Sequence, residues 1–364
     1  MKRYDVVVVG AGMAGASLAA ELAPHASVLI VEAESLPGYH ATGRSAAFWS
    51  ETYGGPGVQP LTSASGLFLR EGGFLRDRGA LHLAAPEHFA LLDRFIREFA
   101  DTGIALLPLD EAAIAAQVPG LRTGAWRGLL EASTADIDVA ALHAHYLHAA
   151  KVAGADLACS APLRFAGREG GRWRIDAGGV LTVEADILVD AAGAWADAVA
   201  RVAGAGPIGI QPYRRTIAQL RVSPDASEDL PLVIDAAERF YFKPEAGGRL
   251  WLSPHDETPS VATDAAPEEI DVAVAIDRME QVVDWRVERV ERSWAGLRSF
   301  APDRLPVYGF DAAVPGFFWF AGQGGFGIQT APAAARLGAA VLLGRPVEAG
   351  LDAERYAPGR FSPA

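Results

Sequence analysis

The segment VVVVGAGMAGASLAAEL, residues 6–22, places a glycine turn between two stretches of different periodicity. The β-branched run before the turn predicts a strand that is buried on both faces of a parallel sheet. The alanine-rich run after it has apolar residues at every third or fourth position and predicts a helix. SVLIVE, residues 27–32, predicts a second strand. This order of elements predicts a βαβ unit, and its G-x-G-x-x-G turn is typical of dinucleotide binding.

Each glycine of the turn has a separate expected role. Gly10 permits the tight turn, Gly12 lets backbone amides approach a pyrophosphate, and Gly15 lets the helix pack closely on the strand. The partial positive charge of the helix N-terminus favours phosphate. Glu32, at the end of the second strand, is placed to accept a hydrogen bond from a ribose hydroxyl. The alternative is a glycine turn that packs a helix on a strand without a nucleotide. The nucleotide contacts expected here are Gly10, Gly12, Met13, Ala14, Gly15, Glu32 and Ala33.

Two later segments favour FAD over a nicotinamide cofactor alone. EADILVDAAGAWADAVA, residues 184–200, predicts another buried strand that ends in a small-residue turn. WFAGQGGFGIQTAPAAARLGAAVL, residues 319–342, predicts a strand, a glycine turn and a helix. A flavoprotein uses such a helix N-terminus near the isoalloxazine, where it stabilises negative charge on the reduced ring.

Composition limits the class of protein. The chain of 364 residues is longer than a domain with one small hydrophobic core requires, so we expect two domains or one large domain with insertions. The net charge is -13 and no Lys/Arg-rich run occurs, so no nucleic-acid partner is expected. Cys159 is the only cysteine, which fits a reducing compartment. The first apolar run is too short for a membrane span or a signal peptide. We therefore expect a cytoplasmic protein with no transmembrane segment, and peripheral association with the inner membrane remains open.

Six further segments, taken with the glycine turn, carry a family resemblance. They are PGYHATGRSAAFWSETYG, AAGAWAD, IQPYRRT, FYFKPE, WAGLRSF and QGGFGIQT. In this order they resemble the FAD-dependent D-amino acid oxidase/glycine oxidase superfamily, and within it bacterial D-arginine dehydrogenase and related D-amino acid dehydrogenases. The resemblance covers Asp5 to about Leu343.

The resemblance implies an α/β fold in which a Rossmann-type FAD-binding domain is interleaved with an α+β substrate domain that has a mostly antiparallel sheet. We expect the FAD-binding domain at 1–80, 138–206 and 300–350, the substrate domain at 81–137 and 207–299, and a C-terminal tail at 351–364. Residues 172–188 alternate as a hairpin would, and 215–222, 239–245 and 249–254 predict further strands. The spacing of apolar residues predicts helices in residues 85–103 and 138–155. We expect the first helix in the substrate domain and the second in the FAD-binding domain.

The resemblance also implies a reaction. A D-amino acid would lose a hydride from its α-carbon to flavin N5, and the imino acid formed would hydrolyse to a 2-oxo acid. The electron acceptor stays open between a quinone, an artificial acceptor and O2, and so does the choice between oxidase and dehydrogenase.

A planar, bidentate guanidinium is the best partner for a substrate carboxylate. The resemblance assigns this role to Arg298 and a second substrate position to Arg215, whose neighbour Arg214 would face the other way along a strand. Tyr53 and Tyr241 match positions whose hydroxyls help to hold the carboxylate. The alternatives are a buried arginine paired with a structural acid, and core tyrosines with satisfied hydroxyls.

The remaining expected positions come from the same resemblance. Gln329 lies beside the substrate, and Gly325 offers a carbonyl to the substrate amine. Glu238 is expected in an active-site loop, with an ordinary hairpin loop as the alternative. The other residues expected in the substrate pocket are Phe48, Ser50 and Ala80. The further cofactor contacts expected are Arg44, Ser45, Ala46, Ala192, Gly193, Trp195, Gly324, Gly327, Ile328, Gln329 and Thr330.

The chain departs from D-arginine dehydrogenase at two pocket positions. Phe48 stands where that family has a histidine, and Ala80 stands where it has a glutamate that pairs with a basic substrate tail. An unpaired buried charge is costly, so we expect an apolar or aromatic D-amino acid. Cys159 lies away from the position where sarcosine oxidases attach flavin, so we expect non-covalent FAD.

Other functions remain open. A flavoenzyme of the same fold could act on glycine, sarcosine, a cyclic imino acid or a 2-hydroxy acid, and a flavin-binding subunit without turnover is a further alternative. His143, His145 and His148 have no accompanying cysteine or carboxylate cluster, so no metal site is expected.

Overall fold

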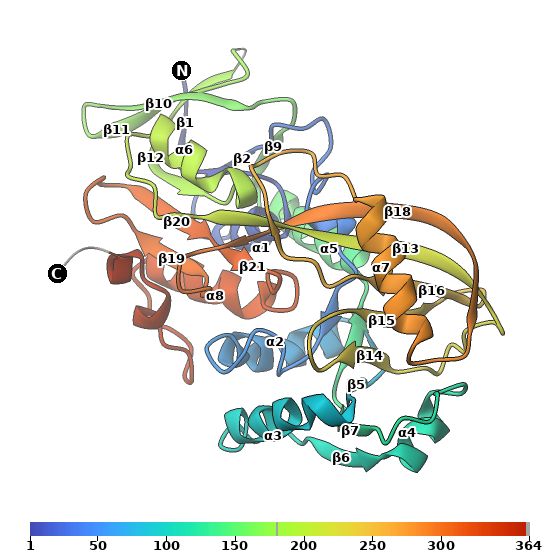
Figure 1. The fold of residues 1–364 in the computed structure, drawn as a ribbon. Helices are drawn as coiled ribbons and strands as arrows, with labels where there is room; N and C mark the ends of the chain where they lie inside the picture. The colour runs from blue at the N-terminus through green and yellow to red at the C-terminus, as the bar shows by residue number, and fades with distance from the viewer. Residues whose placement is uncertain (180, 362–364) are drawn as a thin grey trace.

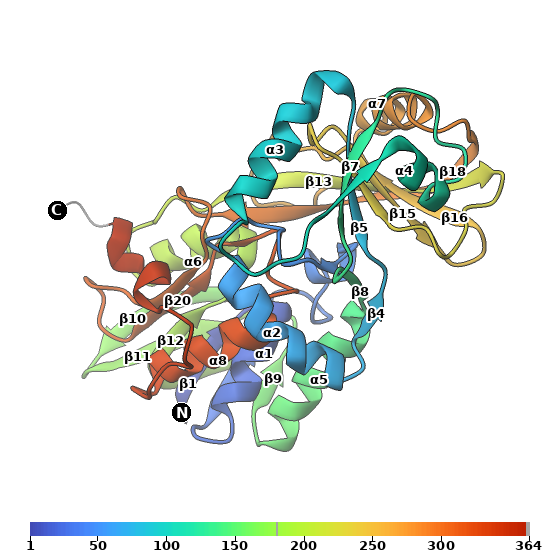
Figure 2. The ribbon, with the colours of Figure 1, turned by 90° about the horizontal axis from the view of Figure 1, so that it is seen from below.

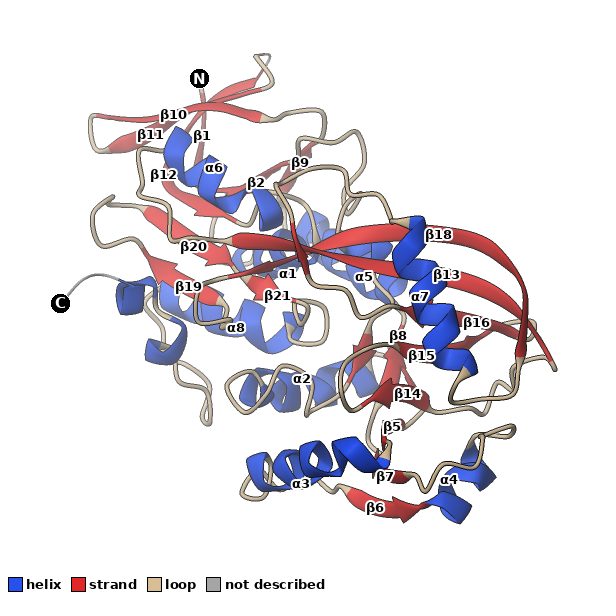
Figure 3. Cartoon of the chain, viewed as in Figure 1, coloured by secondary structure: helices blue, strands red, loops and turns tan. Residues whose placement is uncertain are grey.

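The computed structural model describes residues 1–179 and 181–361. Val180 in the expected hairpin and residues 362–364 of the expected tail lie outside this range. Within the described residues, the strands form an eight-stranded sheet, a ten-stranded sheet and a three-stranded sheet (Figures 1 and 3). They are called the first, second and third sheet below.

The first sheet is built around the strand that precedes the glycine turn. Strands β12, β1, β2 and β9 run parallel in that order, β20 adds to β12 in parallel, and β10, β11 and β19 pair antiparallel. The bounds are β1 (Lys2–Val9), β2 (Val28–Val31), β9 (Asp156–Ala158), β10 (Leu163–Glu169), β11 (Arg172–Ala177), β12 (Leu181–Asp190), β19 (Val307–Phe310) and β20 (Phe317–Ala321). The parallel core of this sheet and the β11–β12 hairpin were both expected from the sequence, and both are present.

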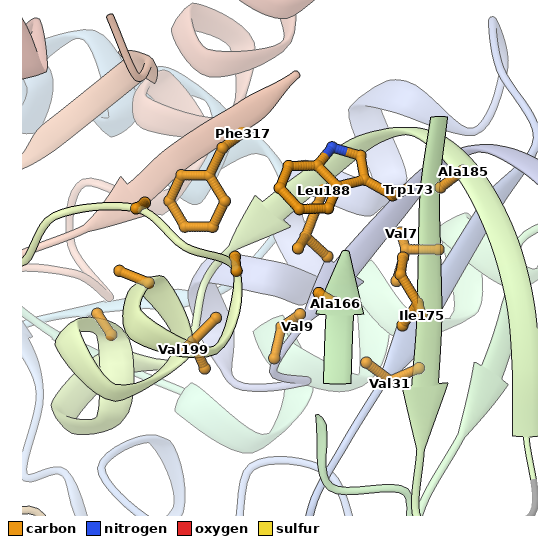
Figure 4. Close-up of a cluster of buried hydrophobic side chains, with 14 of the residues drawn as sticks. Val7, Val9, Val31, Ala166, Trp173, Ile175, Ala185, Leu188, Val199 and Phe317 are labelled. Carbon is orange, nitrogen blue, oxygen red and sulfur yellow. The ribbon is translucent and has the colours of Figure 1, made fainter. Parts of the chain in front are cut away.

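The valines of β1 are buried on both faces of the first sheet. Val7 and Val9 belong to one buried cluster, which Figure 4 shows with Trp173 and Phe317 around them. Val6 and Val8 belong to a second cluster on the opposite face, as the two-residue period of a strand requires. Helix α6 (Ala196–Val202) contributes to the first cluster, and α1 (Met13–Leu22), α5 (Val139–Val152) and α8 (Ala331–Leu342) cover the other face, with α2 (Gln59–Glu71) packed on α8.

The second sheet is antiparallel except where β14 pairs in parallel with β5. Its order is β21-β18-β13-β16-β15-β14-β5-β7-β6, and β17 pairs with β13. The bounds are β5 (Ala80–Ala84), β6 (Leu107–Asp110), β7 (Arg127–Glu131), β13 (Gln211–Ser223), β14 (Leu232–Asp235), β15 (Tyr241–Glu245), β16 (Arg249–Ser253), β17 (Thr258–Pro259), β18 (Arg286–Phe300) and β21 (Gln323–Gly324). Figure 2 shows α3 (Phe89–Glu98), α4 (Glu111–Gln117) and α7 (Glu269–Glu280) around this sheet. Helices α4 and α7 pack on the face that carries Leu81 and Leu83 of β5, whereas α3 packs on the opposite face against Ala84 and Leu129.

The third sheet is small and consists of β3 (Phe48–Trp49), β4 (Leu75–Asp77) and β8 (Ala135–Ile137). The expected domain boundary at residue 80 falls on the first residue of β5, and β21 joins the second sheet from within the expected range 300–350. The expected tail contains two short 3-10 turns, and Tyr356 in the first of them is buried against the first sheet's helical face. Among the described residues, no helix is both long and apolar enough to cross a membrane.

The core beneath the first sheet generates a stability prediction. Phe317 is fully buried in the cluster of Figure 4, and we expect Phe317→Ala to lower the free energy of unfolding by about 3–5 kcal/mol. Phe165, which is 48% exposed, is the matched control, and Phe165→Ala should cost less than about 1 kcal/mol. Urea unfolding followed by tryptophan fluorescence measures both, and equal losses would contradict this view of the core.

Candidate active site

A cavity of about 490 Å³ is lined by residues of the glycine turn at one end and of the second sheet at the other. It brings together residues from distant parts of the chain, between Val9 and Gln329. The expected cofactor contacts that line it are Gly10, Gly12, Met13, Ala14, Glu32, Ala33, Arg44, Ser45, Ala46, Ala192, Gly193, Trp195, Gly324, Gly327, Ile328 and Gln329. Gly15 and Thr330 do not line it, and both lie behind the wall.

The three glycines of the turn are needed for different reasons. Gly10 has φ +103°, and a Cβ there would lie 2.6 Å from the carbonyl oxygen of Ala191. A Cβ on Gly15 would overlap the carbonyl oxygen of Gly10, so α1 packs directly on the turn. Gly12 faces the cavity, where the nearest atom to an added Cβ is Thr42 Oγ1 at 3.3 Å. The space in front of Gly12 and the N-terminus of α1 therefore fits a pyrophosphate.

The carboxylate of Glu32 is fixed at the same end of the cavity. Its Oε2 accepts from the backbone N–H of Ala11 at 2.8 Å, and its Oε1 accepts from that of Glu34 at 2.9 Å. A carboxylate has about four acceptor positions, so each oxygen can take a further hydrogen bond. The half-buried Glu32 thus fits the ribose hydroxyls of a dinucleotide.

Two residues without an assigned role in the sequence analysis brace the glycine turn. Thr42 Oγ1 accepts from the backbone N–H of Met13 at 2.9 Å. His143 Nε2 lies 2.9 Å from the carbonyl oxygen of Ala11. Burial holds the pKa of His143 below its usual value despite this contact and the nearby Glu32. The described residues contain no group of three His, Cys, Asp or Glu side chains that could hold a metal ion.

Arg44 lines the cavity, and its guanidinium is engaged by protein groups. It forms an ion pair with Asp264, and its Nη1 donates to the carbonyl oxygens of Ala265 at 3.1 Å and Ala295 at 3.2 Å. The guanidinium carbon also lies 5.2 Å from the ring centre of Tyr39. Arg44 therefore ties the segment after β2 to β18 and to the loop before α7.

Arg215 and Arg298 reach the other end of the cavity from two paired strands. In the antiparallel register of β13 and β18, Arg215 lies opposite Gly296 and Arg298 opposite Tyr213. Arg298 Nη2 donates to Tyr53 Oη at 3.0 Å, and Arg215 Nε donates to the carbonyl oxygen of Asp256 at 2.8 Å. Arg298 Nε and Arg215 Nη2 are buried and have no hydrogen-bond partner within the described residues.

Aromatic rings form the wall beside these arginines. The ring centre of Phe48 lies 5.0 Å from that of Tyr53 and 6.3 Å from that of Tyr241. All three residues line the cavity. Burial raises the pKa of Tyr241 although Arg215 acts in the opposite direction. The Tyr241 phenol therefore keeps its proton at neutral pH and is available as a hydrogen-bond donor.

Gln329 and Gly325 help to fix the positions of Tyr53 and Arg298. Gln329 Nε2 donates to the carbonyl oxygen of Tyr53 and to Thr62 Oγ1, both at 3.0 Å, and its Oε1 accepts from the N–H of Ser50 at 3.1 Å. Gln329 thereby holds the segment that carries Tyr53. A Cβ on Gly325 would overlap the Arg298 guanidinium, so only glycine leaves room for the side chain as it lies here.

Three residues expected in the substrate pocket do not line the cavity. Ser50 is buried, and its hydroxyl donates to Glu131 at 2.9 Å. Ala80 is buried behind the wall, in a cluster with Tyr241, and pairs across the strands with Glu131. Glu238 is exposed at φ +56° in the turn between β14 and β15. These positions reflect a turn and a strand register that local sequence does not define.

Glu257, an acid that was not expected from the sequence, lies behind the two arginines. Glu257 forms ion pairs with Arg298, with Arg304 at 2.8 Å and with Arg215 at 3.6 Å. It follows β16 in the segment SPHDETP, where no periodic or motif signal marks it. His255 in the same segment is largely buried, and its ring centre lies 5.4 Å from that of Tyr241.

Curated relatives are distant. The chain is 26% identical to FAD-dependent oxidoreductase domain-containing protein 1 of Xenopus laevis over 178 residues, which are 44% of this chain. It spans 36% of that relative's length. It is 26% identical to hydrogen cyanide synthase subunit HcnC of Pseudomonas aeruginosa, in an alignment that covers 100% of this chain and 97% of the relative.

Solved structures share the whole fold. Glycine oxidase from Geobacillus kaustophilus matches with a TM-score of 0.85 at 24% identity and covers 99% of both chains. L-proline dehydrogenase from P. horikoshii matches with a TM-score of 0.85 at 20% identity and covers 99% of this chain and 98% of that chain. At these identities the likeness shows the fold alone, and it confirms the fold class expected from the sequence.

The family itself is shown by a match to nearly the whole chain. The model of the DAO family, described as FAD dependent oxidoreductase, matches residues 5–341. This range includes the glycine turn, Arg215, Arg298 and the final glycine-rich segment. The protein therefore belongs to the DAO family of FAD-dependent oxidoreductases.

Proposed function

We propose that this protein oxidises a D-amino acid with an apolar or aromatic side chain to the imino acid, which water hydrolyses to the 2-oxo acid. The observation that carries the proposal is the pair of buried guanidinium donors, Arg298 Nε and Arg215 Nη2, at the wall of the cavity. A buried donor without a partner costs about 1–3 kcal/mol, and more when it is charged. A substrate carboxylate supplies the missing acceptors in a charge-assisted arrangement.

The proposed clamp has four members. Arg298 and Arg215 hold the carboxylate oxygens. Tyr53 accepts from Arg298 through its oxygen, which leaves its own O–H to donate to the carboxylate. Tyr241 keeps its proton and acts as a second neutral donor. Gly325 presents its backbone beside Arg298, and we assign its carbonyl oxygen as the acceptor for the substrate amine.

The chemical step requires a neutral amine. The substrate ammonium gives a proton to water, and the nitrogen lone pair then forms the C=N bond as hydrogen leaves the α-carbon with its electron pair. FAD, when bound, supplies the acceptor for these two electrons and this hydrogen. The residues of the chain hold the carboxylate, keep the α-carbon in place and limit access of water. The identity of the final electron acceptor stays open between a quinone, an artificial acceptor and O2.

The aromatic wall supports the choice of side chain. Phe48, Tyr53 and Tyr241 present rings where a cationic tail would need a carboxylate. Glu131, the buried acid that pairs with Ala80 across the strands, already accepts from Glu51 N–H, the Thr52 hydroxyl and the Ser50 hydroxyl. An apolar tail gains about 25 cal/mol per Å² of buried surface in such a site.

Two other functions compete with this proposal. The structural neighbours include a glycine oxidase, an L-proline dehydrogenase and an iminodiacetate oxidase, so one fold serves several substrates. Glycine, sarcosine, a cyclic imino acid or a 2-hydroxy acid would place its carboxylate in the same clamp. A non-catalytic flavin-binding subunit is the second competitor, and the unpartnered arginine donors argue against it because a cofactor alone does not require them.

The first prediction concerns the cofactor. Gly12→Val should abolish FAD retention, since the new side chain would enter the space in front of the α1 N-terminus. Gly206→Val is the matched control, because an added Cβ there meets no atom within 4 Å, and it should keep one FAD per chain. The absorbance spectra of the purified proteins give the molar ratio of FAD to protein. Full FAD in Gly12→Val would mean that the turn does not bind the pyrophosphate.

The attachment of FAD is tested in the same preparation. Cys159 does not line the cavity, so we propose that the cofactor is held without a covalent bond. Acid or heat denaturation of the wild-type protein should release all the flavin into the supernatant. Flavin that remains with the precipitated protein would contradict this proposal.

The second prediction concerns the clamp. Arg298→Ala should raise KM for a carboxylate substrate by about 10² or more, since a charge-assisted bidentate pair contributes roughly 3 kcal/mol. Arg292→Ala, on the exposed part of the same strand, should leave KM within about twofold. Steady-state kinetics with an artificial acceptor measures both. An unchanged KM in Arg298→Ala would mean that Arg215, and not Arg298, makes the main contact with the substrate carboxylate.

The third prediction concerns substrate choice. We expect kcat/KM for D-Phe, D-Leu or D-Met to exceed that for D-Arg and D-Lys, because a desolvated cationic tail costs several kcal/mol without a counter-charge. A panel of both enantiomers, with glycine, sarcosine and 2-hydroxy acids, separates the alternatives. D-Arg as the best substrate would show that an acid does reach the pocket. A flavin that no amino acid reduces would favour the hydroxy-acid or non-catalytic functions.

A further inference from the structure

Glu257 lies on the outer side of the carboxylate clamp. Arg298 and Arg215 line the cavity, whereas Glu257 and Arg304 do not. The Glu257 carboxylate is paired with Arg298, with Arg215 at 3.6 Å and with the exposed Arg304 at 2.8 Å. Its side chain is 35% exposed, and those of Arg298 and Arg215 are 11% and 8% exposed. One acid therefore touches both guanidiniums that face the cavity.

The charges around the clamp favour one additional carboxylate. Arg215 and Arg298 carry two positive charges into a poorly solvated wall, and Glu257 offsets one of them. Asp256 is 4.0 Å from Arg215, but its carboxylate also accepts from the N–H and hydroxyl of Thr216 and pairs with Arg214. Solvent screens the exposed Arg304, so at the buried wall two guanidiniums face one acid and a single substrate carboxylate completes the balance there.

Glu257 remains charged at neutral pH. Burial raises the pKa of its carboxyl, while Arg298, Arg304 and Arg215 together outweigh that effect and hold the pKa below its ordinary value. The loop that bears Glu257 also contains His255, which faces Tyr241 and which burial keeps neutral, with its pKa well below the ordinary value. The charge that opposes a second carboxylate in the cavity is therefore that of Glu257.

We propose that Glu257 is an internal counter-ion that sets the clamp to accept one carboxylate and disfavours dicarboxylate ligands. Glu257 acts through Arg298 and Arg215, so it is a positioning and specificity-determining residue. The inference rests on the part of the proposed function that assigns carboxylate binding to these two arginines. It does not depend on which substrate is oxidised.

The test uses two non-reacting ligands of equal chain length, butyrate with one carboxylate and succinate with two. Isothermal titration calorimetry on the purified FAD-loaded protein gives Kd for each. The wild-type protein should bind butyrate more tightly. In Glu257→Gln the ratio of succinate affinity to butyrate affinity should rise about tenfold or more, since one charge is removed within a few ångströms of the ligand.

Glu268→Gln is the matched control. Glu268 is an exposed acid that pairs with Arg214 at 2.9 Å, so its loss changes the net charge equally without touching the clamp. We expect the affinity ratio to stay within about twofold of the wild-type value. A change in Glu268→Gln as large as that in Glu257→Gln would show a general charge effect and overturn the proposal.

Arg304→Gln supplies a second variant with an effect of opposite sign. It removes a cation from Glu257 at the exposed side, so the Glu257 charge acts more strongly on the clamp and the succinate-to-butyrate ratio should fall a few-fold. This variant decides the question if Glu257→Gln does not fold. If Glu257 were only a structural brace, either substitution would lower the affinities for succinate and butyrate equally and leave their ratio unchanged. That result in either variant would overturn the proposal.

The proposed reaction and the counter-ion can fail separately. If no amino acid reduces the flavin but the affinity ratio depends on Glu257 as expected, the proposed reaction is wrong and the proposed role of Glu257 is supported. If amino acids reduce the flavin and the ratio does not move, the reaction stands and the counter-ion is wrong. If the wild-type protein binds neither ligand, or prefers succinate, the counter-ion proposal is overturned.

Discussion

The contact between Gly15 and the carbonyl of Gly10 fixes the distance between α1 and β1, and the binding end of the cavity depends on it. Gly10 in turn approaches Ala191, which follows β12, so three elements meet without intervening side chains. This packing directs the N-terminus of α1 toward the cavity and brings Glu32 beside it. A larger residue at either glycine would separate the elements and move every backbone donor at this edge.

The other end of the cavity depends on the pairing of β13 with β18. These long strands bring Arg215 and Arg298 to the same wall, although 83 positions separate them along the chain. Buried guanidiniums require acceptors, and the protein supplies them only in part, through Tyr53, Asp256 and Glu257. Within the described residues, one buried N–H donor of each arginine has no hydrogen-bond partner, and the proposed carboxylate would satisfy both.

The fold extends to proteins with different substrates. The family match and the structural likeness cover nearly the whole chain, and the structural neighbours include a glycine oxidase, an L-proline dehydrogenase and an iminodiacetate oxidase. This distribution has a physical reason. In the function proposed above, the sheet, the glycine turn and the two arginines would serve any carboxylate substrate of a flavin, while rings such as that of Phe48 would favour one substrate tail over another.

The sequence by itself determined the βαβ unit, the glycine turn, FAD as cofactor and the arrangement of two interleaved sheets. These features arise from short-range patterns and from motifs in a fixed order, so residues 6–32 alone indicate most of the nucleotide end. The register of β5 with β7, which buries Ala80 behind the cavity wall, is set by the tertiary structure. So is the placement of Thr42, His143 and Glu257, because each acts on a residue distant in sequence. Side-chain periodicity shows that a residue is buried or exposed, but only the packed chain determines which charge or carbonyl it meets.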